Sequence, residues 1–273
     1  MVKLTPSQEQ RMWEYSDDIF EDAEYATAQE RDRQYAKTMS GLTAINRKAI
    51  TDMLERPSRH CLAQLERDLA QALVEQGFTE VRTPSIISKA ALAKMTITED
   101  HPLYRQLFFV DDRRVLRPML APNLYFVMRR LRDFTDGPVR IFEIGSCFRK
   151  ESHSTNHLEE FTMLNLVELG PEGDPVDRLK EHIDLIMRTA GMEYTLTEET
   201  SDVYRTTLDV EVDGEEMASG AVGPHVLDPV HDIHEPWSGV GFGLERLIMH
   251  RTGKKNIKKA GRSLVYLNGA KID

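Results

Sequence analysis

The stretch between residues 141 and 165 limits the possible folds of this chain more than any other. Residues 141–148 read as a β-strand, a polar loop rich in Glu and His follows, and a second strand begins near Glu160. Burying a charged side chain costs free energy unless it meets a partner or a ligand. The pattern therefore indicates either a site for a highly charged substrate or an ordinary solvated hairpin. The charged residues around the strand ends are Arg149, Glu151, Glu159 and Glu160.

Length and composition are typical of a folded protein without a membrane segment. A chain of 273 residues can form one large α/β domain or two small ones around a real core. No apolar run approaches the length that spans a bilayer, and the N-terminus lacks the apolar segment of a secretory signal. We therefore expect a cytoplasmic protein with no membrane partner. Cys61 and Cys147 are far apart, so neither a disulfide framework nor a zinc site is indicated.

The net charge of −10 argues against a protein that coats nucleic acid without specificity. Two local basic clusters remain, and each can be a solvated face or a place where a phosphodiester backbone binds. The first cluster is Arg129, Arg130 and Arg132, and the second is Lys254, Lys255, Lys258, Lys259 and Arg262.

The rest of the chain predicts alternating helices and strands. Residues 5–55 carry apolar residues at helical spacing, which indicates two or three helices. A helix over 60–76 should end at Gly77, and a short strand broken by Pro84 follows it. Further predictions are a hairpin over 107–116 with its turn at Asp111-Asp112, helices from about Pro122, over 176–190 and from near Leu244, and a hairpin turn at Asp213-Gly214.

Two later patterns concern possible ligands. Three histidines, at 225, 231 and 234, raise the possibility of a metal site, but no helical i, i+4 pair and no nearby Cys supports it. Gly239, Gly241 and Gly243 leave one face of a strand without side chains, so a flat ligand could lie against the bare backbone there. Arg246 follows in the first helical turn, where its guanidinium could stack on a ring or pair with phosphate.

Together these motifs resemble the signatures of class II aminoacyl-tRNA synthetases. The signatures are Pro84 after a helix and strand, Phe-Arg-x-Glu at 148–151, and the glycine run that ends in Glu245-Arg246. The segments LRPMLAPNLY (116–125), IFEIGSCFRKES (141–152), HLEEFTMLN (157–165) and PWSGVGFGLERL (236–247) are similar to the catalytic domain of the pyrrolysyl-tRNA synthetase family. The resemblance covers roughly residues 55–270.

The resemblance implies a fold and a domain organisation. The expected class is α+β, with the antiparallel β-sheet of the class II catalytic fold flanked by helices. Residues 1–55 would form an N-terminal helical extension packed on the core, and residues 56–273 the catalytic domain. Many members carry a separate basic tRNA-binding domain before the catalytic domain. This chain resembles the subgroup without that domain. The alternative that a separate gene encodes the tRNA-binding domain stays open. A homodimer is expected, with Pro84 near the neighbouring subunit.

The resemblance also implies an ATP site that uses Mg²⁺. Arg149, Glu151 and Arg246 would be the catalytic residues. Arg149 would bind the α-phosphate and the substrate carboxylate, because its guanidinium fork suits an oxyanion. Glu151 would contact the adenine end, and Phe161 and Arg246 would sandwich the adenine. Glu216 and Ser219 would bind Mg²⁺, which prefers hard oxygen ligands. The implied ATP-binding residues are Arg149, Glu151, His157, Leu158, Phe161, Glu216, Ser219, Gly241, Gly243 and Arg246.

A large apolar pocket for the amino acid is the remaining implication. Val167 and Ala221 leave it wide, and Asn165 would bond the amide carbonyl of an N-acylated lysine such as pyrrolysine. Tyr204 would close over the pyrroline ring. The implied pocket residues are Leu120, Leu124, Tyr125, Met128, Met163, Asn165, Val167, Tyr204, Ala221, Trp237 and Gly239.

The implied reaction is ATP-dependent activation of L-pyrrolysine as an adenylate, followed by transfer to the 3′ end of its amber-suppressor tRNA. Two alternatives stay open. One is a class II synthetase for another amino acid, or an acid–ATP ligase on the same fold. The other is a non-catalytic paralogue, which would be expected to lose Arg149 or the glycines of the ATP site.

Overall fold

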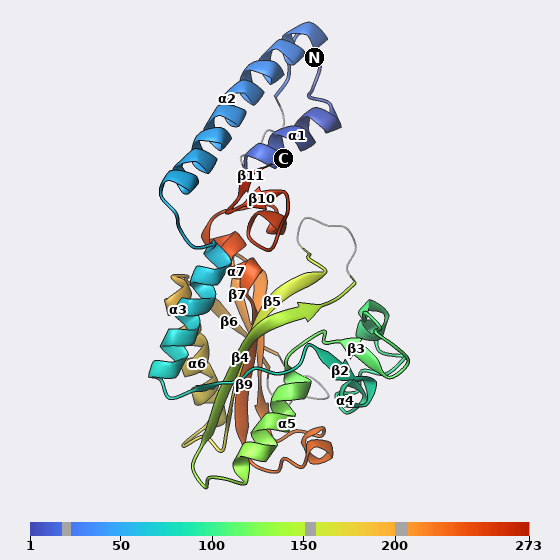
Figure 1. The fold of residues 1–273 in the computed structure, drawn as a ribbon, viewed down its shortest axis with the longest axis vertical. Coiled ribbons are helices and arrows are strands. Elements are labelled where there is room, and N and C mark those ends of the chain that lie inside the picture. Colours follow the sequence, from blue (N-terminus) through green and yellow to red (C-terminus); the bar gives the residue numbers. More distant parts are fainter. Residues whose placement is uncertain (18–22, 151–156, 200–206, 273) are drawn as a thin grey trace.

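A seven-stranded sheet forms the centre of the molecule. The computed structural model describes residues 1–17, 23–150, 157–199 and 207–272. The strands lie in the order β1-β4-β5-β9-β8-β7-β6, with β1 parallel to β4 and the other neighbours antiparallel (Figure 1). Their bounds are β1 Thr79–Glu80, β4 Val139–Phe148, β5 Glu160–Leu169, β6 Thr195–Glu199, β7 Thr207–Val212, β8 Glu215–Gly223 and β9 Trp237–Gly243. The predicted α+β class with an antiparallel sheet is confirmed.

The pairing of β4 with β5 confirms the predicted hairpin. The two strands pair from Val139 opposite Leu169 to Phe148 opposite Glu160, so β4 begins two residues before the predicted start at 141. The predicted turn at Asp213-Gly214 is also confirmed, because both residues have positive φ, 52° and 78°. Paired positive φ values give the twist that joins two adjacent antiparallel strands, here β7 and β8.

Three helices cover one face of the sheet. They are α3 (Cys61–Glu75), α6 (Pro175–Ala190) and α7 (Leu244–Arg251), and α3 and α6 lie beside each other in Figure 1. Asp174 caps α6 by accepting from the main-chain N–H groups of Val176 and Asp177. The apolar stripe of α3, with Leu69 and Leu73 fully buried, packs in the same core as Leu164 and Leu166 of β5. Burial of this shared apolar surface is what holds the helices on the sheet.

The opposite face carries α5 and a small two-stranded sheet. Helix α5 spans Ala121–Arg132, and β2 (Ile86–Ser88) pairs with β3 (Arg114–Leu116). Helix α4 (Lys89–Ala93) and the 3₁₀ segment η1 (Pro102–Gln106) lie between β2 and β3 in the chain. The predicted hairpin over 107–116 is confirmed, because Phe109 forms an antiparallel bridge with Val115 and the Leu116 main-chain N–H donates to the Phe108 carbonyl at 2.9 Å. The sequence did not predict the second partner of β3, which is β2.

A buried ion pair explains why β2 takes that place. Arg117 Nη1 donates to Glu143 Oε1 at 2.7 Å, and both side chains are buried. The Thr83 hydroxyl donates to the other Glu143 oxygen at 2.6 Å, and the Arg117 main-chain N–H donates to the Ser85 carbonyl at 2.9 Å. The segment around Pro84 is therefore fastened to β4 and lies alongside β3. A buried pair of this kind needs each of its hydrogen-bond partners to offset its desolvation.

The N-terminal helices stand at one end of the molecule. Helix α1 spans Pro6–Tyr15, and α2, Ala28–Glu55, has no buried residue. Both lie beside the small sheet of β10 (Tyr266–Leu267) and β11 (Ala270–Lys271), away from the large sheet (Figure 1). The Asn46 side chain exchanges two hydrogen bonds with the main chain of Lys271, at 2.7 and 2.8 Å.

One lysine of the second basic cluster is not on the surface. Lys259, in the 3₁₀ segment η3 (Ile257–Lys259), is 2% exposed. Its ammonium donates to the carbonyls of Trp13 and Ser16 and pairs with Asp17 at 3.0 Å. Lys259 therefore joins η3 to the N-terminal segment, and it is unavailable as part of a basic surface.

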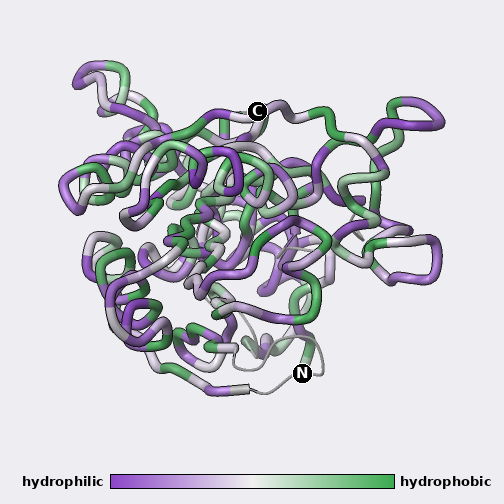
Figure 2. The backbone as a smooth tube through the Cα atoms, turned by 90° about the horizontal axis from the view of Figure 1, so that it is seen from below, coloured by the Kyte–Doolittle hydropathy of each residue, from purple (hydrophilic) through white to green (hydrophobic). Residues whose placement is uncertain are grey.

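Hydropathy is distributed as expected for this layered arrangement. Figure 2 shows hydrophilic residues concentrated in the outlying loops. Across the described ranges, none of the helices has both the length and the apolar character that crossing a membrane requires.

Candidate active site

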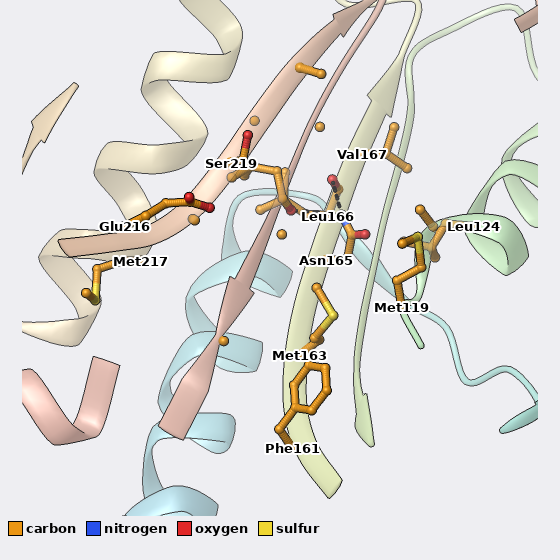
Figure 3. Close-up of a pocket in the computed structure, with 18 of the residues that line it drawn as sticks. Met119, Leu124, Phe161, Met163, Asn165, Leu166, Val167, Glu216, Met217 and Ser219 are labelled. Atoms are coloured by element: carbon orange, nitrogen blue, oxygen red, sulfur yellow. Dashed lines mark hydrogen bonds between the residues drawn. The ribbon is translucent and has the colours of Figure 1, made fainter. Parts of the chain in front are cut away.

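The floor of a cavity on the α5 side of the sheet consists of residues that the strand register places side by side. Residues directly opposite each other on antiparallel strands point to the same face. Asn165 of β5 lies opposite Gly241 of β9, and Gly241 lies opposite Ser219 of β8. The next row joins Val167, Gly239 and Ala221 in the same way. Figure 3 shows Phe161, Met163, Asn165 and Val167 following one another along β5.

The intervening residues of the same strands point into the helix-covered core. Leu164, Leu166, Val240 and Phe242 are buried there. The three glycines of β9 are therefore on the cavity face, as the alternation in the sequence predicts. A Cβ added at Gly243 would meet nothing within 4 Å, whereas one at Gly241 would lie 3.3 Å from the Met163 methyl group. The backbone at Gly243 is thus open to a flat ligand.

A β-bulge places two side chains that carry oxygen atoms on the same face. Residues three apart on a regular strand point to opposite faces, but Glu216 and Ser219 both line the cavity. The pairing of β7 with β8 shifts here: Val210 lies opposite Ala218 and Glu211 opposite Glu216, so Met217 is an extra residue. Met217 and Ala218 are both buried in the helix-side core. The sequence alone gave no sign of this bulge.

The cavity has a volume of about 440 Å³ and combines nearly all of the predicted site residues. It is lined by Leu124, Tyr125, Met128, Arg149, His157, Leu158, Phe161, Met163, Asn165, Val167, Glu216, Ser219, Ala221, Trp237, Gly239, Gly241, Gly243 and Arg246. Three predicted residues are not in that set. Glu151 and Tyr204 fall outside the described residues, and Leu120 is fully buried in the α5 core and does not reach the cavity wall.

One end of the cavity carries charge. The Arg149 Nε donates to the Pro118 carbonyl at 3.0 Å, and its guanidinium carbon lies 5.2 Å from the centroid of the Phe161 ring. Arg246 Nη1 donates to the Glu216 carbonyl at 2.7 Å, which fixes the second guanidinium beside the bulge. Two oriented cations and the exposed Glu216 carboxylate suit a ligand that carries phosphate and a divalent cation.

Glu245 is a charged residue of the cavity that the sequence reasoning missed. It is 1% exposed and accepts the Thr162 main-chain N–H at 2.9 Å with both oxygens. Burial raises the pKa of this carboxyl group. Arg262 donates to the Thr162 hydroxyl at 2.6 Å and lies 3.5 Å from Glu245. Glu245 therefore ties α7 to β5. Its place in the sequence directly before Arg246, a predicted site residue, could have indicated that Glu245 lies in the cavity.

The other end of the cavity is apolar. Leu124 and Met128 come from α5, and Met163 and Val167 face them from β5 (Figure 3 labels Leu124, Met163 and Val167). The sequence reasoning missed Met95 and Met119 there, because both come from irregular segments without a periodic pattern. Unbranched methionine side chains adapt to irregular ligands, so this end suits a bulky apolar group.

Asn165 contributes an amide within this apolar region. Its Nδ2 donates to the Val240 carbonyl at 2.8 Å and, in a longer contact, to the Leu166 carbonyl at 3.4 Å. The first bond fixes the plane of the amide. Since an amide nitrogen carries two hydrogens, the weaker contact can be exchanged for a bond to a ligand.

The three histidines have separate environments. Within the described part of the chain, no group of three or more His, Cys, Asp or Glu side chains is arranged to hold a metal ion. His225 and His231 are packed among aromatic side chains, and burial lowers the pKa of both. The His234 side chain is 68% exposed. Glu216 and Ser219, which line the cavity, carry oxygen atoms of the kind that Mg²⁺ prefers.

Comparisons with known proteins agree with this geometry. A family model described as the class II core domain (F) of tRNA synthetases matches residues 44–267. A crystal structure of pyrrolysyl-tRNA synthetase from Desulfitobacterium hafniense is 45% identical, with a TM-score of 0.93 and coverage of 99% of this chain and 98% of that one. A second structure of the synthetase from this organism is 43% identical, with a TM-score of 0.91 and coverage of 99% and 95%.

More distant relatives are synthetases for other amino acids. The phenylalanine–tRNA ligase alpha subunit of Prochlorococcus marinus (strain MIT 9312) is 26% identical over 218 residues, which is 74% of this chain. The chain spans 61% of the length of that subunit and 65% of the corresponding Streptococcus thermophilus (strain ATCC BAA-491 / LMD-9) subunit.

Proposed function

This chain belongs to the class II aminoacyl-tRNA synthetases, within the pyrrolysyl-tRNA synthetase family, and from that membership we propose that it charges tRNA with L-pyrrolysine. The reaction activates pyrrolysine with ATP and transfers it to the 3′ end of the amber-suppressor tRNA. One observation carries the proposal: the register row Asn165, Gly241 and Ser219 joins a wide apolar cavity end to a charged end across three strands. Such a cavity suits an apolar amino-acid side chain at one end and a triphosphate at the other.

ATP binds at the charged end in this proposal. The Arg149 guanidinium binds the α-phosphate and the amino-acid carboxylate together, so that the carboxylate is aligned for in-line attack. Phe161 and Arg246 enclose the adenine, which lies over the open backbone at Gly243. His157 and Leu158 border the same end. Glu216 and Ser219 hold Mg²⁺, which supplies charge neutralisation to the phosphates when bound. Glu151 stays a prediction for the adenine contact.

Pyrrolysine binds at the apolar end. The methionine and leucine side chains of α5 and β5 surround the ring, and the small Ala221 leaves room for it. The Asn165 amide N–H that makes the longer contact to Leu166 donates to the substrate carbonyl instead, while the 2.8 Å bond to Val240 keeps the amide in place. An enzyme for phenylalanine would need a tighter pocket, and one for serine a more polar pocket. Tyr204 stays a prediction for the cover of this pocket.

The tRNA binds to basic groups on the catalytic body. Arg129 is paired with Asp133 and Asp232, and Arg132 with Glu235, so these two guanidiniums are partly neutralised. We therefore place more of the phosphate contact on Arg130, Lys254, Lys255 and Lys258. The proposal includes a homodimer with the Pro84 segment near the second subunit, and a cytoplasmic location, where tRNA is charged.

The decisive experiment is aminoacylation of the amber-suppressor tRNA. We expect charging with pyrrolysine, or with a lysine that carries a carbamate on Nε, and ATP–pyrophosphate exchange that depends on the same amino acids. Arg149→Ala should abolish the exchange. A panel of the standard amino acids, phenylalanine included, is the control. Exchange that is faster with phenylalanine than with every lysine derivative, or near-normal exchange by folded Arg149→Ala, would refute the assignment.

A further inference from the structure

Asp228 is a buried carboxylate that contacts two walls of the apolar cavity end. It lies in the 3₁₀ segment η2 (Asp228–His231) and is 0% exposed. Its Oδ2 accepts from the Trp237 indole Nε1 at 2.8 Å, and its Oδ1 accepts from the Tyr125 hydroxyl at 3.2 Å. Both aromatic residues line the cavity, Tyr125 from α5 and Trp237 from β9. We infer that Asp228 is a positioning residue that fixes these walls and thereby sets the affinity for the amino acid.

The inference deepens the proposed function and rests on it, because the walls concern the substrate end of the same cavity. Asp228 itself does not line the cavity and would touch neither substrate. Its effect therefore has to pass through Tyr125 and Trp237, and the structure shows how each of the two is held.

His225 gives the hydrogen bonds around Asp228 a direction. Its Nδ1 accepts the Leu227 main-chain N–H at 3.1 Å, so the neutral ring carries its hydrogen on Nε2. That nitrogen lies 3.0 Å from the Tyr125 hydroxyl, which accepts from it and donates to Asp228. The main-chain N–H of His225 also donates to Asp228 Oδ2, at 2.7 Å. The carboxylate thus sets the orientation of the tyrosine hydroxyl.

Ring contacts couple the two walls. Tyr125 stacks on His231 with centroids 4.3 Å apart, and it meets Trp237 edge to face at 5.9 Å. Trp237 also meets His225 edge to face, at 5.5 Å. A displacement of either wall therefore changes the contacts of the other, and Asp228 is bonded to both.

Gly223 supplies the space that lets the indole reach Asp228. It lies directly opposite Trp237 on β8, and a Cβ at this position would come within 1.8 Å of the Trp237 Nε1. Gly223→Ala therefore displaces the indole at the same Nε1 edge that donates to Asp228, without changing the carboxylate. It provides a second variant that tests the position of Trp237 independently of Asp228.

The charged cavity end has anchors of its own. Arg149 is fixed by the Pro118 carbonyl and Arg246 by the Glu216 carbonyl. Neither anchor includes Asp228, Tyr125 or Trp237. A residue that positions only the apolar walls should therefore change the KM for the amino acid and leave the KM for ATP unchanged, which a general loss of folding would not do.

The test compares Asp228→Ala and Asp228→Asn with the wild type in ATP–pyrophosphate exchange, with a lysine that carries a carbamate on Nε. We expect Asp228→Ala to raise the amino-acid KM about tenfold or more, because two polar wall groups lose their partner, while the ATP KM stays within about twofold. Asp228→Asn keeps an oxygen for Trp237 but puts a donor against the tyrosine hydroxyl. Its KM should lie between those of Asp228→Ala and the wild type.

Trp237 fluorescence gives a readout that needs no substrate. The chain has two tryptophans, so Trp13→Phe leaves Trp237 as the reporter. In that background, Asp228→Ala and Gly223→Ala should shift the emission to the red and increase quenching by acrylamide, whereas Asp228→Asn should not. Asp232→Asn is the matched control, because Asp232 is an exposed acid four residues later that does not line the cavity.

Each outcome decides the question. Equal rises in both KM values, or unchanged KM values in folded variants with unchanged emission, overturn the positioning role. If Asp228→Ala does not fold, Asp228→Asn decides: a raised amino-acid KM with unchanged emission supports the role, and an unchanged KM refutes it. If the wild type accepts no lysine derivative, the proposed function fails, and the emission of the variants still shows whether Asp228 holds Trp237.

Discussion

The guanidinium of Arg149 lies over the ring of Phe161, with 5.2 Å between the guanidinium carbon and the ring centroid. The two residues face each other from the adjacent strand ends of β4 and β5, and the Pro118 carbonyl holds the Arg149 Nε. The arginine is therefore preorganised before any ligand binds, because the bond from Nε to Pro118 fixes the orientation of the whole planar guanidinium. Preorganised donors contribute most of the electrostatic stabilisation in such reactions.

Arg149→Lys tests whether the fork or only the charge matters. A lysine keeps the positive charge but cannot bond Pro118, phosphate and carboxylate in one plane. We expect the kcat of ATP–pyrophosphate exchange to fall by about 10²–10³-fold, the usual loss when one oriented donor is removed. Arg82→Lys, at a mostly exposed arginine, serves as the control and should retain full activity. Near-normal exchange by Arg149→Lys would show that a point charge suffices.

Gly243→Ala tests the open backbone. The added methyl group meets no protein atom within 4 Å, so the thermal stability should be unchanged. The methyl group would occupy the space proposed for ATP, and we expect the KM for ATP to rise about tenfold, which corresponds to about 1.4 kcal/mol. Gly41→Ala is a matched control, because its added methyl group also meets nothing within 4 Å, but it lies on α2. Unchanged ATP affinity in Gly243→Ala would place the nucleotide elsewhere.

Glu168→Gln tests an ion cluster on the helix side of β5. The fully buried Glu168 accepts from His182, Arg140 and Arg178 at 2.7–3.0 Å. Burial opposes its ionisation, but these bonds prevail and lower its pKa from 4.5 to about 2. The ionised group stabilises the fold fully above pH 4.5, by about 3 kcal/mol, and this contribution is lost as the pH falls toward 2.

The free energy of unfolding, measured in urea from pH 2 to 8, should show this pattern. Glu168→Gln should be less stable than the wild type by about 3 kcal/mol at neutral pH, and the difference should shrink below pH 4.5. Glu193→Gln, at an exposed side chain outside this cluster, is the control. A difference that is independent of pH would mean that the charge of Glu168 is not what stabilises the fold.

Cys147 should be chemically inert in the folded protein. Its side chain is fully buried, and burial raises the pKa of the thiol to about 12. Only about one thiol in 10⁴ would be ionised at pH 8, and the thiolate is the reactive form. In a Cys61→Ser background, labelling by a disulfide reagent should follow the rate of unfolding and become rapid in guanidinium chloride. Rapid labelling of the native protein would contradict the burial.

Local patterns in the sequence predicted the centre of the fold correctly. The β4–β5 hairpin, the glycine face of β9 and the turn at Asp213-Gly214 each depend on residues that are close in the chain. The alternation of glycine with Val240 and Phe242 determines which face is bare whatever the strand's neighbours are. The resemblance to a known family then supplied most of the cavity residues, including Arg149 and Asn165.

Features that depend on distant partners were missed. β3 pairs with β2 because Glu143 and Arg117 hold the Pro84 segment in place, and no short-range signal contains that information. The burial of Lys259 depends on carbonyls some 240 residues earlier in the chain. The bulge at Met217 appears only in the pairing with β7. Each of these results from tertiary contacts that outweigh local preference.

The register of β5, β9 and β8 makes the cavity sensitive to the length of these strands. A strand has a side-chain period of two, so one inserted residue moves every following side chain to the opposite face. An insertion early in β9 would turn Val240 and Phe242 into the cavity and bring glycines against the helix-side core. Length variation between homologous enzymes should therefore occur in the turns at the ends of these strands, while the strands themselves diversify by substitution.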